Sequence, residues 1–303
     1  MNEAYIEQTR LMLRVIPHVS KEECFALKGG TAINFFVRDM PRLSVDIDLV
    51  YLPIGSRTEA LAGIEAALKR IKENILRTVR GGVKIQEGLH EGRAIKLLVS
   101  GPGGTVKIEV NPVLRGIIGK PVMGTVSKKV QATFDLSASI QTVPMADLYG
   151  GKICAALDRQ HPRDLFDIKV LLANEGITTD IRRAFIVYLA SHSRPMHEVI
   201  APSRENIQAL YETHFLGMTD EPVTPEELTA ARETLILLLK HASTAPEKQF
   251  LLSITEGKPD WKLMNMPGIE KLPAIQWKLQ NIAKMDKAKL KDQLGQLKTK
   301  LGV

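Results

Sequence analysis

Two short motifs near the start of the chain contain the residues best suited to phosphate chemistry. The first is Gly29-Gly30-Thr31, a glycine turn that can approach a phosphate closely, with a hydroxyl beside it. The second is the alternating stretch 42–49, whose polar residues share one face of a strand: Arg42, Ser44, Asp46 and Asp48. Two carboxylates one strand step apart repel each other, and a divalent cation reverses that preference. The pattern suggests a metal-dependent nucleotide site, although each motif alone is more often a plain turn or a solvated edge strand.

A third carboxylate is expected on a neighbouring strand, because two-metal sites usually have one there. Alternation recurs in residues 105–111, where Lys107, Glu109 and Asn111 face one way. Glu109 is therefore the candidate third metal ligand. A surface glutamate on an exposed strand face explains the same pattern about equally well.

The segment 147–168 contains a further group of charged residues. Pro162 fits the first position of a helix, which places a helix–helix connection just before it. Lys152 lies beside small residues early in the first helix, where its ammonium group can reach a triphosphate as a point charge. Arg163, Asp164 and Asp167 lie in the second helix. A salt-bridged helical hairpin without any ligand is the plainer alternative.

Taken together, these motifs resemble the AbiEii/AbiGii-type nucleotidyltransferase toxins, a family that includes the MenT toxins. The resemblance covers residues 25–175 and depends on the order and spacing of Lys28-Gly29-Gly30-Thr31-Ala32, Arg42-x-Ser44-x-Asp46-x-Asp48, Lys152, Arg159 and Arg163-Asp164-x-x-Asp167. It implies an α+β fold, with a polymerase β-like nucleotidyltransferase domain (a mixed sheet with flanking helices) followed by a mainly helical domain. It also implies an enzyme that is the toxin of a type IV toxin–antitoxin or phage-defence system.

The resemblance implies a role for each matching residue. Asp46 and Asp48 bind Mg²⁺ in a two-metal site, with Glu109 as the less secure third ligand. The catalytic residues are Asp46, Asp48, Lys152 and Asp167, with Asp164 as the alternative to Asp167. The nucleotide-binding residues are Gly29, Gly30, Thr31, Arg42, Ser44, Lys152, Arg163 and Asp164. The substrates are a nucleoside triphosphate (NTP) and an acceptor, most plausibly RNA and tRNA in particular, and a cognate antitoxin is the expected protein partner.

Hydrophobic periodicity predicts the elements that position these residues. Helices are expected at 3–15, 31–36 and 58–76, with Ser56 or Arg57 near the N-cap of the third. Strands are expected at 42–51, 82–87, 94–99 and 105–110, followed by a strand pair between 122 and 140. The remainder is helical, at 145–159, 162–174, 179–190, 226–241 and 273–301. The domains are then 1–143, the nucleotidyltransferase domain, and 144–303, a helical domain that completes the active site and ends in a basic helix.

Composition limits the cellular setting. With 44% hydrophobic and 25% charged residues the chain reads as an ordinary soluble protein, and no stretch has membrane-spanning length. The first residues lack a secretion signal, and two distant cysteines suit a reducing cytoplasm. The net charge of +7 is concentrated in residues 271–303, which hold eight lysines and two aspartates. This segment predicts a docked amphipathic helix with a solvated basic face, and RNA phosphate binding is the sharper alternative.

Two other functions are compatible with the sequence. The fold can retain the nucleotide and act as a nucleotide- or RNA-binding module without turnover, but such a module has little use for two adjacent metal-seeking carboxylates. A nucleotidyltransferase acting on a small molecule, such as an aminoglycoside, has no need of the basic segment 271–303.

Overall fold

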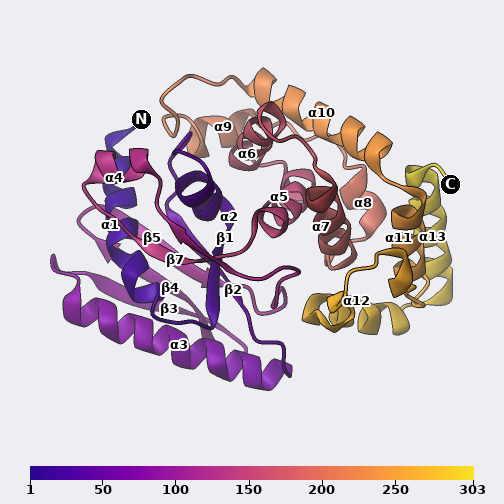
Figure 1. Cartoon of the computed structure of the whole chain (residues 1–303), viewed down its shortest axis with the longest axis horizontal. Coiled ribbons are helices and arrows are strands. Elements are labelled where there is room, and N and C mark those ends of the chain that lie inside the picture. Colours follow the sequence, from indigo (N-terminus) through magenta and orange to yellow (C-terminus); the bar gives the residue numbers. More distant parts are fainter. The chain divides into compact units, whose positions relative to one another are not determined.

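A seven-stranded mixed β-sheet is the framework of the N-terminal part of the chain (Figure 1). The computed structural model describes all residues, 1–303. The strand order is β3-β4-β5-β2-β1-β7-β6. The strands are β1 (Phe25–Lys28), β2 (Asp46–Tyr51), β3 (Lys84–His90), β4 (Arg93–Gly101), β5 (Gly104–Val110), β6 (Val122–Thr125) and β7 (Ser139–Thr142).

Strand β2 lies in the middle of this sheet and carries the acidic pair. It runs parallel to β5 and antiparallel to β1, so Asp48 lies opposite Glu109 on one side and Lys28 on the other. Together with the helices described below, this mixed sheet confirms the predicted α+β class. The three predicted strands between residues 82 and 110 are present as β3, β4 and β5.

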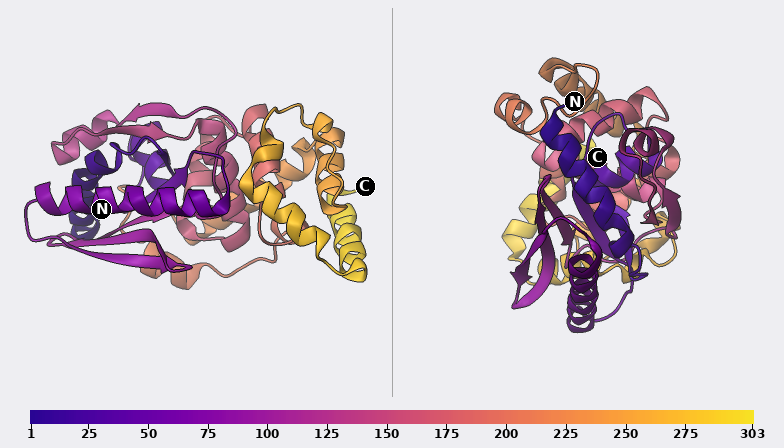
Figure 2. Two further views of the ribbon diagram at one scale, coloured as in Figure 1. Left: turned by 90° about the horizontal axis from the view of Figure 1, so that it is seen from below. Right: turned by 90° about the vertical axis from the view of Figure 1, so that its left-hand side faces the viewer.

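Two helices cover one face of the sheet. Helix α1 (Glu3–Val19) packs against β5 and β7, helix α3 (Arg57–Thr78) packs against β4, and the two helices contact each other. Figure 2 (left) shows α3 running alongside the β3–β4 hairpin. The residues of β5 that alternate with its charged ones, Val106, Ile108 and Val110, are buried. The charged residues of β2 and β5 therefore point to the opposite face.

The boundaries of these helices depend on local chemistry. Ser56 is the N-cap of α3, as predicted, and forms a capping box in which its hydroxyl accepts from the amide of Glu59. Helix α1 continues past Pro17 to Val19, four residues beyond the predicted end, because Ile16 and Val19 are fully buried there. The predicted helix 31–36 begins earlier, as α2 (Gly29–Thr31), and continues as a π-helix, η1 (Ala32–Val37).

The prediction that the acidic strand begins at residue 42 was wrong. β2 begins at Asp46, and residues 42 and 43 pair with a segment distant in sequence: Leu43 N donates to Met218 O, and Arg42 bridges to Thr219. Arg42 is 2% exposed and Ser44 is 4% exposed, so neither lies on a solvated strand face. The alternating sequence pattern therefore begins four residues before the strand begins.

The rest of the chain is helical apart from the short connections. The helix α4 (Lys128–Phe134) lies between β6 and β7 and was not predicted. The following helices are α5 (Met145–Arg159), α6 (Pro162–Ala173), α7 (Thr179–Ala190), α8 (Met196–Ile200), α9 (Gln208–His214), α10 (Pro225–Ala242), α11 (Ala245–Thr255), α12 (Pro273–Ala283) and α13 (Lys287–Leu301), with 3₁₀ turns η2 (Trp261–Leu263) and η3 (Ile269–Lys271).

The predicted single helix 273–301 is in fact two helices. Asp286 is the N-cap of α13, and its carboxylate accepts from the amides of Ala288 and Lys289. This cap starts a new helix three residues after α12 ends.

The chain forms two units. The first contains Met1–Pro144 together with Leu216–Pro222, and the second contains Met145–Phe215 together with Val223–Val303. The sequence suggested domains of 1–143 and 144–303. In the structure the short segment 216–222, which pairs with residues 42–43, belongs with the first unit. None of the helices combines the length and the apolar character needed to cross a membrane.

Candidate functional site

The glycine turn of the first unit is pressed directly against the acidic strand. Gly29 has a φ of +71°, and a Cβ at this position would lie 2.6 Å from Asp48 Oδ2. A Cβ at Gly30 would lie 2.6 Å from Arg42 Nη2 and 3.1 Å from Ser44 Oγ. Both glycines are therefore needed for close packing, because an added side chain at Gly29 would overlap the carboxylate of Asp48.

Thr31 fastens this turn to the beginning of β2. The side chain is 1% exposed, and Oγ1 lies 2.9 Å from Ser44 Oγ and 2.5 Å from the carbonyl oxygen of Asp46. Arg42 lies alongside and donates from Nη1 to its neighbour's carbonyl, Leu43 O, at 2.8 Å. A direct contact of Thr31 with a phosphate, as the sequence suggested, would have to replace these hydrogen bonds.

The open face of the sheet carries alternating acids and lysines. Asp46 lies opposite Lys107 and Asp48 lies opposite Glu109. Glu109 is held by two lysines, with Oε1 2.8 Å from Lys96 Nζ and Oε2 2.9 Å from Lys107 Nζ. Burial alone would raise the pKa of Glu109, but the hydrogen bonds from Lys96 and Lys107 outweigh it and leave that pKa below its usual value.

Lys107 was not identified as a site residue from sequence, although its place beside Glu109 was evident. Burial would lower the pKa of Lys107, but the hydrogen bond to Glu109 and the charges of Asp46 and Asp48 raise it. The lysine therefore remains charged and offsets part of the repulsion within the acidic pair.

The acidic pair fits a divalent cation. Asp46 and Asp48 share one half-buried face, and Mg²⁺ commonly takes one or two carboxylates and fills its other positions with water and substrate phosphates. No group of three or more His, Cys, Asp or Glu side chains in residues 1–303 is placed to hold a metal ion. Glu109 would have to release both lysines to serve as a third ligand, and that role remains a prediction.

A buried charge cluster lies in the second unit, where α5 and α6 meet. Lys152 Nζ lies 2.8 Å from Asp164 Oδ1 and 2.9 Å from Asp167 Oδ2. The three side chains are at most 6% exposed. The structure thus gathers three of the residues that the sequence marked as catalytic or nucleotide-binding.

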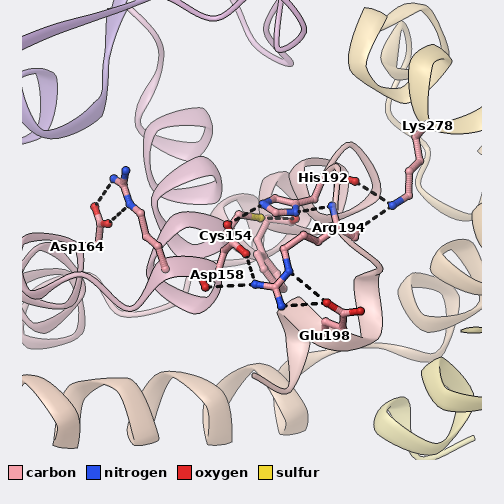
Figure 3. A network of polar contacts seen from close by, with 9 residues as sticks. Cys154, Asp158, Asp164, His192, Arg194, Glu198 and Lys278 are labelled. Atoms are coloured by element: carbon pink, nitrogen blue, oxygen red, sulfur yellow. Dashed lines mark hydrogen bonds and ion pairs between the residues drawn. The ribbon is translucent and has the colours of Figure 1, made fainter. Parts of the chain in front are cut away.

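Arg159 forms an ion pair with Asp164. Its Nε lies 2.6 Å from Asp164 Oδ2 and its Nη2 lies 3.1 Å from Asp164 Oδ1, a two-pronged ion pair visible at the left of Figure 3. Although burial would raise the pKa of Asp164, the charges of Lys152 and Arg159 hold it far below its usual range. Both oxygens of Asp164 are engaged in these ion pairs.

Close packing of α5 on α7 fixes the position of Lys152. A Cβ at Gly150 would lie 2.9 Å from the backbone of Ala184 and Phe185, so only glycine allows this approach. In the first turn of α5, the buried carboxylate of Asp147 accepts from the hydroxyl of Tyr188 at 2.9 Å. Asp147 and Gly150 stand within the segment 147–168, but no sequence pattern pointed to their partners on α7.

The other end of α5 is held by a second polar network, shown in Figure 3. Arg194 Nη1 lies 2.6 Å from Asp158 Oδ1, and Arg194 Nη2 lies 2.9 Å from Glu198 Oε2. Lys278 of α12 donates to the carbonyl oxygens of His192 and Arg194 at 2.9 and 2.8 Å. Burial lowers the pKa of Lys278 to about 8. The network ties α5, α8 and α12 together.

The start of α6 is also ordered by a side chain. His161 is its N-cap, with Nδ1 accepting from the amide of Arg163 at 3.2 Å, and Pro162 occupies the first turn as predicted. Burial, and then the charge of Arg163, lower the pKa of His161 to about 4, so the ring is neutral at pH 7 and can accept this bond.

Comparison with known proteins identifies the family of the chain. The chain matches no curated protein. Its fold is similar to that of MenT4, a nucleotidyltransferase toxin from Mycobacterium tuberculosis H37Rv, with a TM-score of 0.61 and 15% identity over 90% of this chain and 93% of that one. The model of a family described as "Nucleotidyl transferase AbiEii toxin, Type IV TA system" matches residues 10–281. The chain therefore belongs to the AbiEii family of nucleotidyltransferase toxins of type IV toxin–antitoxin systems.

Proposed function

We propose that this nucleotidyltransferase transfers a nucleoside monophosphate from an NTP to a hydroxyl group of RNA, with tRNA as the preferred acceptor, and that it requires Mg²⁺. The observation that carries the proposal is the acidic pair of β2 set against the Gly29-Gly30 turn, with the Asp48 carboxylate in the space that a side chain at Gly29 would need. Bound Mg²⁺ neutralises triphosphate charge and aligns the reacting oxygens.

The proposed reaction is an in-line displacement at the α-phosphorus. The acceptor hydroxyl oxygen forms a bond to that phosphorus, and the bond from phosphorus to the bridging oxygen of the β-phosphate breaks. Pyrophosphate leaves with the electron pair of that bond. The hydroxyl proton passes to the carboxylate of Asp46 or Asp48, which are the acids on the open face of β2.

The remaining residues bind and position. The Gly29-Gly30 backbone leads into a helical turn, which allows its amides to face phosphate oxygens. Arg42, Ser44 and Thr31 hold that turn in place through the contacts described above. In the second unit, Lys152 and Arg163 are the proposed triphosphate-binding residues and Asp167 is a proposed catalytic residue, with Asp164 orienting Lys152.

The basic segment 271–303 supports an RNA acceptor. Its helix α13 exposes five lysines, which suit contacts to phosphates that do not depend on sequence: Lys287, Lys289, Lys291, Lys298 and Lys300. An NTP and tRNA are both found in the cytoplasm, which is where we place the activity. A cognate antitoxin is then the protein partner, and a role in phage defence follows from the same toxin function.

The test is transfer of label from each of the four α-labelled NTPs to total RNA in the presence of Mg²⁺. The wild-type protein should label RNA, and Asp46→Ala should reduce the rate to background. Asp39→Ala is the matched control, because this exposed aspartate bonds only Lys129 and Ser127 and lies outside the acidic pair.

Three results would overturn the proposal. The first is equal labelling of RNA by wild type and Asp46→Ala. The second is the absence of any labelled acceptor with every NTP. Transfer to an aminoglycoside but not to RNA would favour the small-molecule alternative, especially if a protein lacking residues 271–303 remained active.

A further inference from the structure

Arg115 carries a buried positive charge without a carboxylate beside it. The residue is 6% exposed. Its Nη1 donates to the carbonyl oxygen of Ser56 at 3.2 Å, and its Nε, which is itself buried, has no hydrogen-bond partner. Buried arginines are almost always paired, because an uncompensated charge away from water is costly. A guanidinium in this state indicates that an anion belongs beside it.

The loop that carries Arg115 is well ordered. Asn111 Oδ1 accepts from the amides of Val113 and Leu114, and the amide of Arg115 donates to Val113 O. The amide of Gly116 donates to Tyr51 O, which ties the loop to the end of β2. The position of the Arg115 side chain is therefore set by the fold and is not a property of a loose loop.

Other positive groups surround the guanidinium. Ser56 is the N-cap of α3, a helix of 22 residues, so Arg115 faces a long helix at its positive end. Arg57, the first residue of α3, is close enough that, after burial, its charge is the next cause lowering the pKa of Arg115. Tyr51 alone acts in the opposite direction.

Two carboxylates belong to this end of α3, and both are engaged. Glu91 pairs with Arg57 at 2.7 Å, in a pair whose side chains are 34% and 55% exposed and which is therefore weak. Glu59 completes the capping box with the hydroxyl and amide of Ser56. Neither acid is a partner of Arg115, so neither carboxylate at this end of α3 neutralises its guanidinium.

We propose that Arg115, Arg57 and the N-terminus of α3 form a binding site for a phosphate group. Guanidinium forks and helix N-termini both suit phosphate, which has several acceptor oxygens and more charge than a carboxylate. Residues 53–56 are exposed and the side chain of Arg57 is partly exposed, so a ligand can enter from that side.

The site is separate from the acidic pair. Gly116, the neighbour of Arg115, is bonded to Tyr51, the last residue of β2, whereas Asp46 is the first, and a six-residue strand spans about 17 Å. The phosphate can belong to the backbone of the RNA acceptor, a reading that rests on the proposed function, or it can be free inorganic phosphate. Both sources present the same chemistry to Arg115.

The first experiment measures binding of inorganic phosphate to the full-length protein by calorimetry and by thermal unfolding, with chloride adjusted to hold ionic strength constant. Wild type should show saturable binding and a rise in Tm. Arg115→Gln should abolish both effects, and Arg57→Gln should weaken binding about tenfold or more, since each removes a charged hydrogen bond. Arg93→Gln, which breaks only a surface pair with Glu65, is the control and should bind phosphate as wild type does.

The second experiment measures RNA binding with the same variants and with phosphate as competitor. Weakened RNA binding in Arg57→Gln, together with competition by phosphate, would assign the site to the RNA backbone. Unchanged RNA binding alongside lost phosphate binding would assign it to free phosphate. Asp46→Asn should bind phosphate normally, so the site survives even if nucleotidyl transfer is not the function.

The proposal is overturned if wild type does not bind phosphate saturably, or if Arg57→Gln and Arg93→Gln bind it as tightly as wild type. Should Arg115→Gln fail to fold, Arg57→Gln decides the question, because Arg57 is partly exposed and its loss leaves the buried core intact.

Discussion

At the scale of single residues, the contact between Gly29 and Asp48 matters most. The carboxylate of Asp48 occupies the space that a side chain at position 29 would need. The glycine therefore fixes the acid as well as shaping the turn. A phosphate that approaches the turn backbone is brought beside the acidic pair for the same reason.

Gly29→Ala should displace Asp48 and reduce nucleotidyl transfer by about 100-fold, the effect expected when a catalytic group moves by about 1 Å. Gly82→Ala is a close control, because Gly82 has a φ of +70° and a methyl group added there would meet nothing within 4 Å. Both variants bear the same backbone strain, so comparable unfolding midpoints with unequal transfer rates are expected. Equal activities would show that the contact with Asp48 is unimportant.

Protonation of Asp164 should destabilise the folded protein in acid. The pKa of Asp164 in the folded state lies below the unfolded value of about 3.9. Such a group stabilises the fold above the unfolded pKa, and the contribution is lost as the pH falls through about 4 and below. Asp164→Asn should therefore flatten the dependence of the unfolding free energy on pH between about 5 and 2, measured by urea denaturation. A slope equal to that of wild type would contradict the role of the ion pairs with Lys152 and Arg159.

Residue types and spacing singled out Asp46, Asp48, Lys152 and the Arg163-to-Asp167 segment as candidates, and the structure brings Lys152 together with Asp164 and Asp167. Their partners were harder to predict. The two-pronged pair of Arg159 with Asp164 depends on the angle between α5 and α6, and the pairing of Glu109 with Lys96 depends on the register of β4 and β5. The charge of Arg115 went unnoticed because its surroundings come from β2 and α3, which are distant in sequence.

At the scale of elements, α5 is positioned by its contact with α7. Gly150 and Gly151 are adjacent, but a Cβ at Gly150 would lie 2.9 Å from α7 backbone, whereas one at Gly151 would be 3.7 Å from the ring of Tyr188. The first distance is a clash and the second is an ordinary contact. A methyl group added at Gly150 would therefore clash with α7, whereas one added at Gly151 would fit.

Gly150→Ala should push α5 away from α7 and destabilise the fold by about 1–3 kcal/mol. Gly151→Ala should be neutral or stabilise it by about 0.5–1 kcal/mol, because alanine favours the helix. Chemical denaturation of the two variants gives this comparison directly. Equal stability of the two variants would show that α5 and α7 can separate without cost.

Most long elements were predicted because their apolar periods are strong. The ranges 145–159 and 179–190 agree with α5 and α7 to the residue. The predicted bounds were wrong where tertiary partners or caps determine the structure. Residues 42 and 43 pair with the distant Thr219 and Met218, and the cap at Asp286 divides the last helix. Helix α11 was missed although Thr244 and Glu247 form a capping box that is readable in the sequence.

At the scale of the whole molecule, positive charge is concentrated at one end of the sequence. Residues 271–303 hold eight lysines and two aspartates, against a net charge of +7 for the chain. Helix α13 buries Leu297 and Leu301 and leaves its lysines exposed. The helix therefore both packs against the second unit and presents charge to solvent.

If α13 contacts RNA, replacing Lys287, Lys289 and Lys291 with glutamine should lower the salt dependence of RNA binding, with the slope of log K against log salt falling in magnitude by about 2. Replacing Lys69, Lys84 and Lys120, which are exposed in the first unit, removes the same charge elsewhere. Binding measured over a salt series should separate the two triple variants. Equal slopes would mean that only net charge matters and that α13 is not a specific RNA contact.

The most direct test of nucleotidyl transfer by the acidic pair is the mass of the RNA product, measured with pyrophosphate release in the same reaction. Wild-type protein with Mg²⁺ should add the mass of one or more nucleoside monophosphates to RNA and release one pyrophosphate for each, and Asp48→Asn should do neither while remaining folded. RNA of unchanged or reduced mass with wild-type protein, or equal addition by Asp48→Asn, would contradict the account.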